Sequence, residues 1–282
     1  MYLMESLHTL LEKVTQAQEL INAKRPFEGN ALIQLQKYYK YETTWSSNAL
    51  EGNTINLHET QMILEHGITV RGHTLKEIYE CTGHSSAYDY MFEAIQKKEI
   101  DEAYIKKLHY LFAKDIKDIP CPGEYRNVSK TFVTISGSEY PCPDYEQVPE
   151  KMVEFIDWAD TVRSEMHPVE YAAEAHRRFV YIHPFPDGNG RVARLLMNTV
   201  LLQEHYMPVL IHPDQRKAYV KSLENGRIYP GGFDIFIAER ELEQQTRFIK
   251  LLNMEVPQNI REEKKEIKEN RRCTDDDYGM GY

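Results

Sequence analysis

The segment His183-Pro184-Phe185-Pro186-Asp187-Gly188-Asn189-Gly190-Arg191, followed by Arg194, holds the densest group of reactive side chains in the sequence. Its two prolines disfavour helical backbone at the residues before them, so we expect His183 and Phe185 to be extended and the segment to form a loop. Its glycines let the backbone approach a ligand, and a helical apolar pattern begins at Arg191. The sequence thus predicts an anion site of free amides at a helix N-terminus.

The side chains of this segment suit the transfer of a phosphate-linked group. His183 titrates near neutral pH and could take the proton from an attacking hydroxyl. Asp187 offers the hard oxygen that Mg²⁺ prefers, while Arg191 and Arg194 can fork onto phosphate oxygens and Asn189 can donate to another. Each residue taken alone is usually just part of a turn, but their joint spacing favours a phosphate site.

The pattern His-x-Phe-x-Asp-Gly-Asn-Gly-Arg-x-x-Arg resembles the signature of Fic-domain proteins at every fixed position. The resemblance, over about residues 45–252, implies an all-α Fic fold with a β-hairpin flap and an N-terminal helical extension. It implies that His183 is the base and that Asp187 holds Mg²⁺. Gly188, Asn189 and Gly190 would support the α-phosphate of ATP, and the two arginines would bind the outer phosphates.

A second stretch, Ser46-Ser47-Asn48-Ala49-Leu50-Glu51-Gly52, indicates a short helix opened by a Ser cap and closed by Gly52. Glu51 would then lie at the negative end of a helix dipole, where it needs a cation; a solvated surface glutamate is the alternative. Ser47-x-x-x-Glu51-Gly52 also resembles the autoinhibitory motif of Fic proteins. That resemblance implies that Glu51 pairs with Arg194 and occupies the space of the ATP γ-phosphate.

Residues 120–143 change in character, because branched and aromatic residues up to Ile135 precede a turn at Ser136-Gly137-Ser138. This pattern predicts a β-hairpin that needs support from the helices. By the Fic resemblance it is the flap: Thr134, Ile135 and Ser136 would contact the nucleotide, and the exposed edge would take a target segment as an added strand. A purely structural hairpin is the alternative.

The charge, the apolar runs and the cysteines limit the kinds of partner and the location that we expect for the protein. The net charge is −10, which argues against broad binding of nucleic acid or anionic membranes. No apolar run approaches the length of a membrane span and the N-terminus lacks a basic signal-peptide start, so we expect a cytoplasmic protein. The cysteines show no zinc spacing, and we expect Cys121 and Cys142, each in Pro-Cys-Pro, to remain thiols.

The rest of the chain is predicted to be helical, and three regions are expected: an N-terminal helical region with the inhibitory motif (1–110), a catalytic core (111–255) and a charged, flexible tail (256–282). The apolar stripe of the helix expected over 3–21 indicates packing in the hydrophobic core, and a homodimer interface is the alternative. Tyr219 is expected to pack against adenine, and His176 to be buried and hydrogen-bonded. We expect no chemistry from His84 or His109. The other expected helices cover 31–43, 57–66, 74–97, 101–114, 148–163, 167–181, 191–205, 215–225 and 234–252.

The function that this resemblance implies is transfer of AMP from ATP to a Ser, Thr or Tyr hydroxyl of a target protein, or of the protein itself. Fic relatives also transfer other phosphate-linked groups or remove AMP, and the spacing does not separate these outcomes. A third hypothesis is a binding module, in which Glu51 is locked in place and the hairpin or the N-terminal stripe binds a peptide or a second copy.

Overall fold

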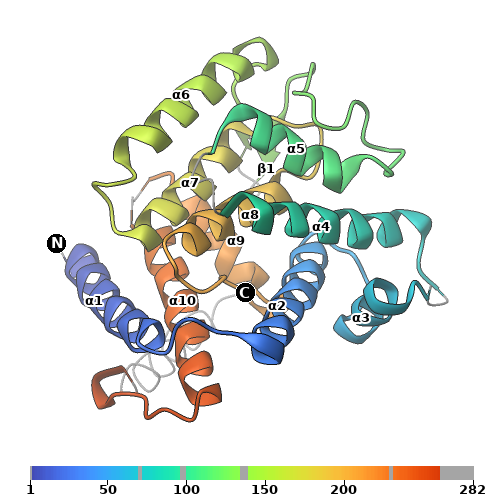
Figure 1. Cartoon of the computed structure of the whole chain (residues 1–282). Helices are drawn as coiled ribbons and strands as arrows, with labels where there is room; N and C mark the ends of the chain where they lie inside the picture. Colours follow the sequence, from blue (N-terminus) through green and yellow to red (C-terminus); the bar gives the residue numbers. More distant parts are fainter. Residues whose placement is uncertain (1, 69–71, 96–99, 134–138, 229–230, 261–282) are drawn as a thin grey trace, which may run out of the picture.

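The structure, a computed structural model, describes residues 2–68, 72–95, 100–133, 139–228 and 231–260. It confirms the expected all-α fold, with helices gathered around a buried centre and, among these residues, a single short hairpin near α5 (Figure 1). The expected tail from 261 onward lies outside the described residues. The helices are α1 (Tyr2–Asn22), α2 (Gly29–Leu50), α3 (Leu57–His66), α4 (Leu75–Ala94), α5 (Glu102–Ala113), α6 (Val148–Val162), α7 (Pro168–Ile182), α8 (Asn189–Gln203), α9 (Arg216–Asn225) and α10 (Gly232–Leu251).

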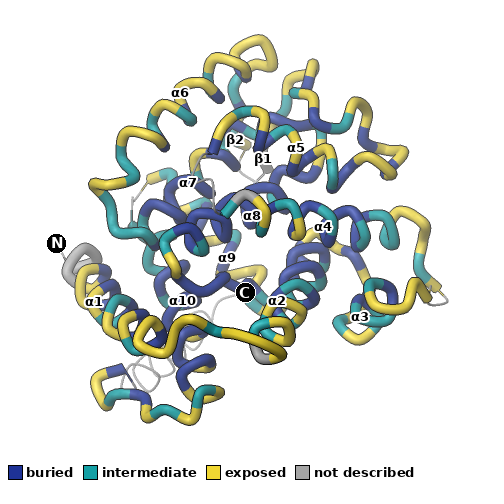
Figure 2. The backbone as a smooth tube through the Cα atoms, in the orientation of Figure 1, coloured by how far each residue is buried: buried dark blue, intermediate teal, exposed yellow. Residues whose placement is uncertain are grey.

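The centre of the molecule is α8, which follows the phosphate-site segment. Nearly all of its residues are buried, and α7, α4 and α5 pack around it (Figure 2). A helix that is apolar on several sides needs partners on several sides. The helix that begins at the predicted anion site is therefore also the helix around which the fold is built.

The first helix belongs to the core of the domain. Val14, Ala17 and Ile21 are fully buried because the apolar stripe of α1 packs along α10. This is the core role that we preferred for the stripe, and it leaves those residues unavailable for a dimer seam. One hydrophobic cluster runs from Leu7 to Ile260, so the N-terminal region and the catalytic segment share a core. The three-region division stays a prediction.

The second helix corrects the sequence reading. In place of a helix over 31–43 and a separate Ser-capped one, α2 runs unbroken from Gly29 to Leu50, with Ser46 and Ser47 buried in its interior. Serine and threonine are weak helix formers, and burial of this stretch against neighbouring helices overrides that preference. The predicted end holds, since Gly52 follows the helix with φ of 96°.

Capping residues predicted from the sequence mark the first turns of several helices. Thr74 and Glu77 form the predicted capping box of α4, and Asp101 caps α5 as expected. Asn56 and Glu59 form another box at α3. Such caps satisfy amides that the first helical turn leaves without partners. The other helix ends agree with the sequence prediction to within three residues, as far as the described residues extend.

The predicted hairpin pairs β1 (Thr131–Val133) with β2 (Glu139–Pro141) in antiparallel register, with Thr131 opposite Pro141.

Two predictions from composition can be compared with the structure. Cys121 and Cys142 are free thiols, as expected. Within the described ranges, the chain has no helix with the length and apolar character that membrane crossing requires.

Truncation of the α1 stripe should destabilise the whole domain. Ile21 has an exposed fraction of 0%, so Ile21→Ala should lower the free energy of unfolding by about 2–5 kcal/mol. Leu251 is 67% exposed, and Leu251→Ala should change it by less than about 0.5 kcal/mol. Urea unfolding followed by circular dichroism measures both. Equal effects of the two substitutions would show that α1 is not part of the cooperative core.

Candidate active site

The loop begins with a left-handed residue. His183 has φ of 51° and ψ of 57° and ends α7, and its N–H donates to the carbonyl of Phe179 at 3.0 Å. Our expectation of an extended His183 was therefore wrong. The proline at 184 disfavours only the right-handed helical region at His183, and a left-handed residue is a common way to end a helix. The reversal places His183 directly at the end of a buried helix.

Asn189 closes the loop. Its side-chain oxygen accepts a hydrogen bond from the Phe185 N–H at 2.9 Å, and its side-chain nitrogen donates to the Phe185 carbonyl at 2.8 Å. The residue is buried. Both of its polar atoms hold the loop shut, and the second N–H of its carboxamide is the donor left for the expected phosphate contact, which stays a prediction. Helix α8 also begins at Asn189, two residues earlier than predicted.

Two glycines are required by close contacts. Gly188 has φ of 79°, and a Cβ there would lie 2.7 Å from the Phe112 ring. A Cβ on Gly190 would lie 2.4 Å from the Glu51 carboxylate. Gly188 is the N-cap of α8 and provides no capping side chain. The first amides of α8 thus receive no cap from this residue, and the Glu51 carboxylate lies next to Gly190 in the first turn.

A histidine that we expected to be inert supports this loop. His109 Nδ1 accepts from the Gly123 N–H at 2.9 Å, so Nε2 carries the proton and donates to the Asp187 carbonyl at 3.1 Å. Its ring stacks on Phe185 with centroids 3.9 Å apart. Burial, the largest effect, lowers the pKa of His109 to about 4 and keeps it neutral. His109 is a positioning residue, and its distance in sequence from the motif concealed that role.

Two cations flank the expected base. Arg126 Nε donates to the His183 carbonyl at 2.9 Å, and Lys130 Nζ donates to the Pro186 carbonyl. Burial, followed by the charge of Lys130, lowers the pKa of His183 to about 4. His183 is therefore neutral at pH 7 and able to accept a proton. The sequence analysis identified neither cation, because both lie just before the hairpin and far from the motif in sequence.

Arg194 is the most fully bonded side chain of the site. It is 4% exposed, and its Nε donates to Ser47 Oγ at 2.9 Å. Nη2 donates to the Ser47 carbonyl at 2.9 Å and to Glu51 Oε1 at 2.8 Å, and Nη1 donates to the Tyr219 hydroxyl at 3.3 Å. The pairing of Glu51 with Arg194 that the resemblance implied is therefore present in the structure.

The end of α2 explains how Ser47 can serve Arg194. The Glu51 amide bonds to Asn48 O, while Gly52 N bonds to Ala49 O and Asn53 N to Asn48 O, which is a Schellman motif with Gly52 at C′. The tightened turn leaves the Ser47 carbonyl to accept from Arg194. Gly52 permits this ending because its φ is positive.

The charge of Glu51 is stabilised from several sides. Partial burial raises its pKa, but the guanidinium groups of Arg194 and Arg191 outweigh burial and lower it overall. The acid at the negative end of α2 thus has the cation it needs, and the positive end of α8 beside it. At neutral pH Glu51 is a carboxylate.

Arg191 is held by an acid that the sequence analysis did not single out. Its Nη1 lies 2.9 Å from Oε1 of Glu80, on α4, and its guanidinium lies 4.3 Å from the centroid of the Phe112 ring. Its Nη2 lies 3.6 Å from Oδ1 of Asp187. Both motif arginines are therefore paired with carboxylates.

The expected adenine platform is wrong, since Tyr219 is 5% exposed and packs against Phe233 and Phe236. Its hydroxyl lies 3.0 Å from Nε2 of His176 and also meets Arg194. The Tyr219 ring thus belongs to the hydrophobic core, and its hydroxyl accepts a hydrogen bond from Arg194. His176 is buried and hydrogen-bonded as predicted, and burial lowers its pKa to about 3.

A cavity of about 380 Å³ adjoins the motif, bounded by Glu51, Glu80, Asp187 and Arg191 among others. The Asp187 side chain is 53% exposed and could supply one oxygen to Mg²⁺. Within the described residues no group of three metal-ligating side chains occurs, so the remaining ligands would have to be phosphates and water. A single carboxylate beside a phosphate site fits such an ion.

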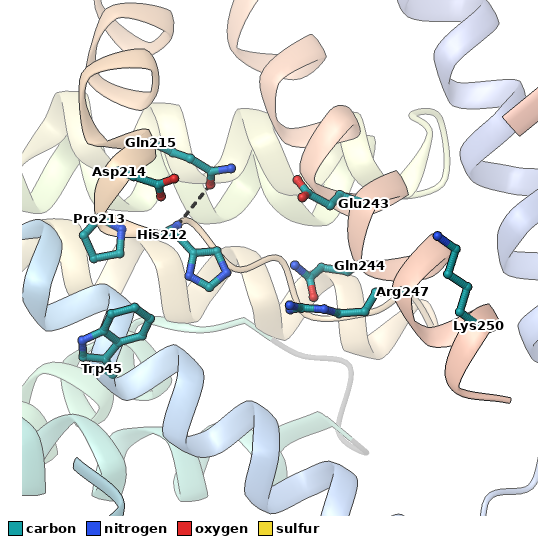
Figure 3. A pocket seen from close by; sticks show the side chains of 9 residues that line it. All are labelled: Trp45, His212, Pro213, Asp214, Gln215, Glu243, Gln244, Arg247 and Lys250. Atoms are coloured by element: carbon teal, nitrogen blue, oxygen red, sulfur yellow. Dashed lines mark hydrogen bonds between the residues drawn. The ribbon is translucent and has the colours of Figure 1, made fainter. Parts of the chain in front are cut away.

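A larger cavity of about 780 Å³ lies between α2 and α10 (Figure 3). Trp45 and His212 form one side, and Arg247 and Lys250 extend from α10 on the other. None of its lining residues belongs to the motif, so the chemistry is not placed there. The predicted nucleotide contacts Thr134, Ile135 and Ser136 lie outside the described residues.

The comparisons with known proteins agree with this geometry. The model of the Fic/DOC family matches residues 99–201, the stretch from α5 to the end of α8. This chain carries a Fic domain. Proteins named Protein adenylyltransferase Fic are 38% identical over 215 residues in Drosophila willistoni and 37% over 218 residues in Drosophila grimshawi. These matches cover 74% and 75% of the chain but only 42% and 44% of the relatives, so the chain spans less than half of their length.

Solved structures show the same Fic fold. A Fic domain containing signaling protein from Bacteroides thetaiotaomicron superposes with a TM-score of 0.78 at 26% identity, covering 83% of this chain and 94% of that protein. A fragment of Fic-1 from C. elegans superposes with a TM-score of 0.79 at 25% identity, covering 88% of this chain and 73% of the fragment.

Removal of the His109 bonds should loosen the Fic loop. His109→Phe keeps a ring against Phe185 but leaves the Gly123 amide and the Asp187 carbonyl without their partner. An unsatisfied buried polar group costs about 1–3 kcal/mol, so we expect a loss of unfolding free energy of that size or greater. Chemical denaturation measures it. A loss below about 0.5 kcal/mol would mean that the two bonds do not hold the loop.

The lowered pKa of His183 can be measured directly. In an NMR titration its imidazole should be neutral through pH 6 and protonate with a pKa of about 4, below the usual 6.5. Lys130→Met removes a neighbouring positive charge and should raise that pKa. A midpoint near 6.5 in the wild type, or no rise in the variant, would contradict this electrostatic account.

Proposed function

We propose that this Fic domain transfers AMP from ATP to a hydroxyl of a protein, and that Glu51 restrains it. The observation that carries the proposal is the pairing of Arg194 with Glu51 at the uncapped start of α8, beside a neutral His183. The adenylyltransferase relatives support the same reaction. The target is a Ser, Thr or Tyr hydroxyl of another protein or of the chain itself.

His183 supplies the base in this mechanism. Its neutral imidazole accepts the proton of the target hydroxyl, whose oxygen attacks the α-phosphorus of ATP. The bond from that phosphorus to the bridging oxygen breaks, and pyrophosphate leaves with the bonding electron pair. The stacked Phe185 and His109 hold the loop beneath the imidazole, so that its position is fixed before a substrate arrives.

The start of α8 would bind the phosphates. The Asn189 and Gly190 amides receive no side-chain cap from Gly188 and would support the α-phosphate, together with the Gly188 amide once its 2.6 Å hydrogen bond to Asp187 Oδ1 is released. Arg191 and Arg194 would bind the outer phosphates. Asp187 would hold Mg²⁺, which neutralises phosphate charge when bound. Positioning and charge stabilisation then supply most of the rate.

Restraint by Glu51 follows from competition for one guanidinium and one helix end. The carboxylate bonds Arg194 at 2.8 Å and lies where any Cβ on Gly190 would stand. A phosphate of ATP needs the same donors, so nucleotide and carboxylate cannot both be satisfied. Because the pKa of Glu51 is lowered, the pair persists at neutral pH and is lost only on acidification.

Glu51→Gly should release the enzyme. A hydrogen bond to a charged group contributes about 1.5–3 kcal/mol, so its loss should raise the transfer rate by roughly 10- to 100-fold. The measurement is incubation with labelled ATP, UTP or GTP, followed by mass analysis of the protein and of candidate targets. We expect added AMP from ATP and little transfer from the other nucleotides.

The control is the double variant Glu51→Gly with His183→Ala, which should be about 10²- to 10⁴-fold slower through loss of the base. Equal rates in the single and double variants would refute the role of His183. Transfer of UMP or GMP in place of AMP would reassign the substrate, and no transfer with ATP bound would favour a binding module.

A further inference from the structure

Glu80 joins the segment after Glu51 to the catalytic helix. Its Oε1 lies 2.9 Å from Nη1 of Arg191, and its Oε2 accepts a hydrogen bond from Nδ2 of Asn53 at 2.9 Å. The same Asn53 nitrogen also reaches the carbonyl of Glu77 at 3.0 Å. Both oxygens of one carboxylate are thus in use, one toward the site and one toward the segment that carries the restraint.

This junction is shielded from water. Glu80 is 7% exposed and Arg191 is 3% exposed. Charge interactions strengthen in such surroundings, and removing one partner of a buried pair leaves an uncompensated charge. The charge of Glu80 therefore constrains the position of the guanidinium.

The other contacts of the Arg191 guanidinium are a ring on one face and a cavity beside it. One face of the guanidinium lies over Phe112 at 4.3 Å. Nε and Nη1 are both buried and, among the residues that the structure describes, make no hydrogen bond of good geometry, although Nη1 lies 2.9 Å from Glu80 Oε1. Arg191 and Glu80 both line the cavity of about 380 Å³ beside the motif. The guanidinium is thus held by the charge of Glu80 and by one face on Phe112, and two of its nitrogens retain unmet hydrogen-bonding capacity.

We propose that Glu80 is a positioning residue that holds Arg191 ready for the outer phosphates of the nucleotide, and that Asn53 couples this support to the Glu51 segment. The proposal rests on the proposed function for the nature of the ligand. Glu80 acts through Arg191, since an acid that touched the phosphates would repel them. A pre-oriented guanidinium binds phosphate without the cost of ordering a long side chain.

The test is equilibrium binding of ATP with Mg²⁺ by calorimetry in the Glu51→Gly background. Adding Glu80→Gln keeps the shape and an acceptor for Asn53 but removes the charge that anchors Arg191. We expect Kd and KM for ATP to rise about tenfold, with kcat at saturating ATP changed by less than about threefold, because ground-state binding is lost. Adding Glu80→Asp, which keeps the charge, should recover part of the affinity.

The matched control is Glu59→Gln, which alters a capping acid outside the cavity and should leave the Kd within about twofold of the background. A Kd that is unchanged or tighter in the Glu80→Gln variant overturns the proposal, because Glu80 would then be inert or a competitor for Arg191. So does a fall in kcat with KM unchanged. Should Glu80→Gln unfold, a folded Glu80→Asp variant whose Kd and KM equal those of the Glu51→Gly background would also overturn it, because the shorter acid moves the charge away from Arg191.

The outcome can be separated from that of the proposed function, because binding requires no transfer. Intact ATP binding without transfer in the Glu51→Gly variant would refute the function alone, and the comparison of Kd values would still decide the role of Glu80. Absence of ATP binding in that background would refute both.

Discussion

The buried guanidinium of Arg194 is the constraint on which the site depends. A cation that is 4% exposed needs acceptors around it, and the structure supplies them from Ser47, Glu51 and Tyr219. These residues come from α2 and α9, so one side chain of α8 fixes two other helices. Desolvation lowers the pKa of Arg194, but Glu51 and Tyr219 raise it overall, so the charge is retained. The proposed restraint and the architecture therefore share one set of bonds.

Under the proposed function, the same arrangement would give the site a restrained state and an open state. With Glu51 in place, each motif arginine has a carboxylate partner, Glu51 for Arg194 and Glu80 for Arg191. The two pairs differ in how easily they can part. Glu51 lies on a helix end that a Schellman turn closes, with a side chain 36% exposed, whereas Glu80 is buried and held by Asn53. We infer that the first pair opens for nucleotide and the second supports it.

Sequence reasoning reached the parts that local chemistry specifies. The motif residues, the end of α2 at Gly52 and the capping boxes follow from short-range rules, and the charge of Glu51 pointed to a cation. It failed where distant contacts decide: Ser46 and Ser47 are inside a helix because neighbours bury them, and Tyr219 became core through packing on Phe233 and Phe236. His109 and Glu80 precede the motif by many residues and carry no local signal. Only the fold brings them to it.

The most direct test of the central claim is calorimetry of ATP with Mg²⁺ bound to three proteins: the wild type, Glu51→Gly, and Glu51→Gly with Arg194→Met. If carboxylate and phosphate compete for Arg194, the single variant should bind at least about tenfold tighter than the wild type, and the double variant should lose that gain. Equal affinity in the wild type and in Glu51→Gly would contradict the account.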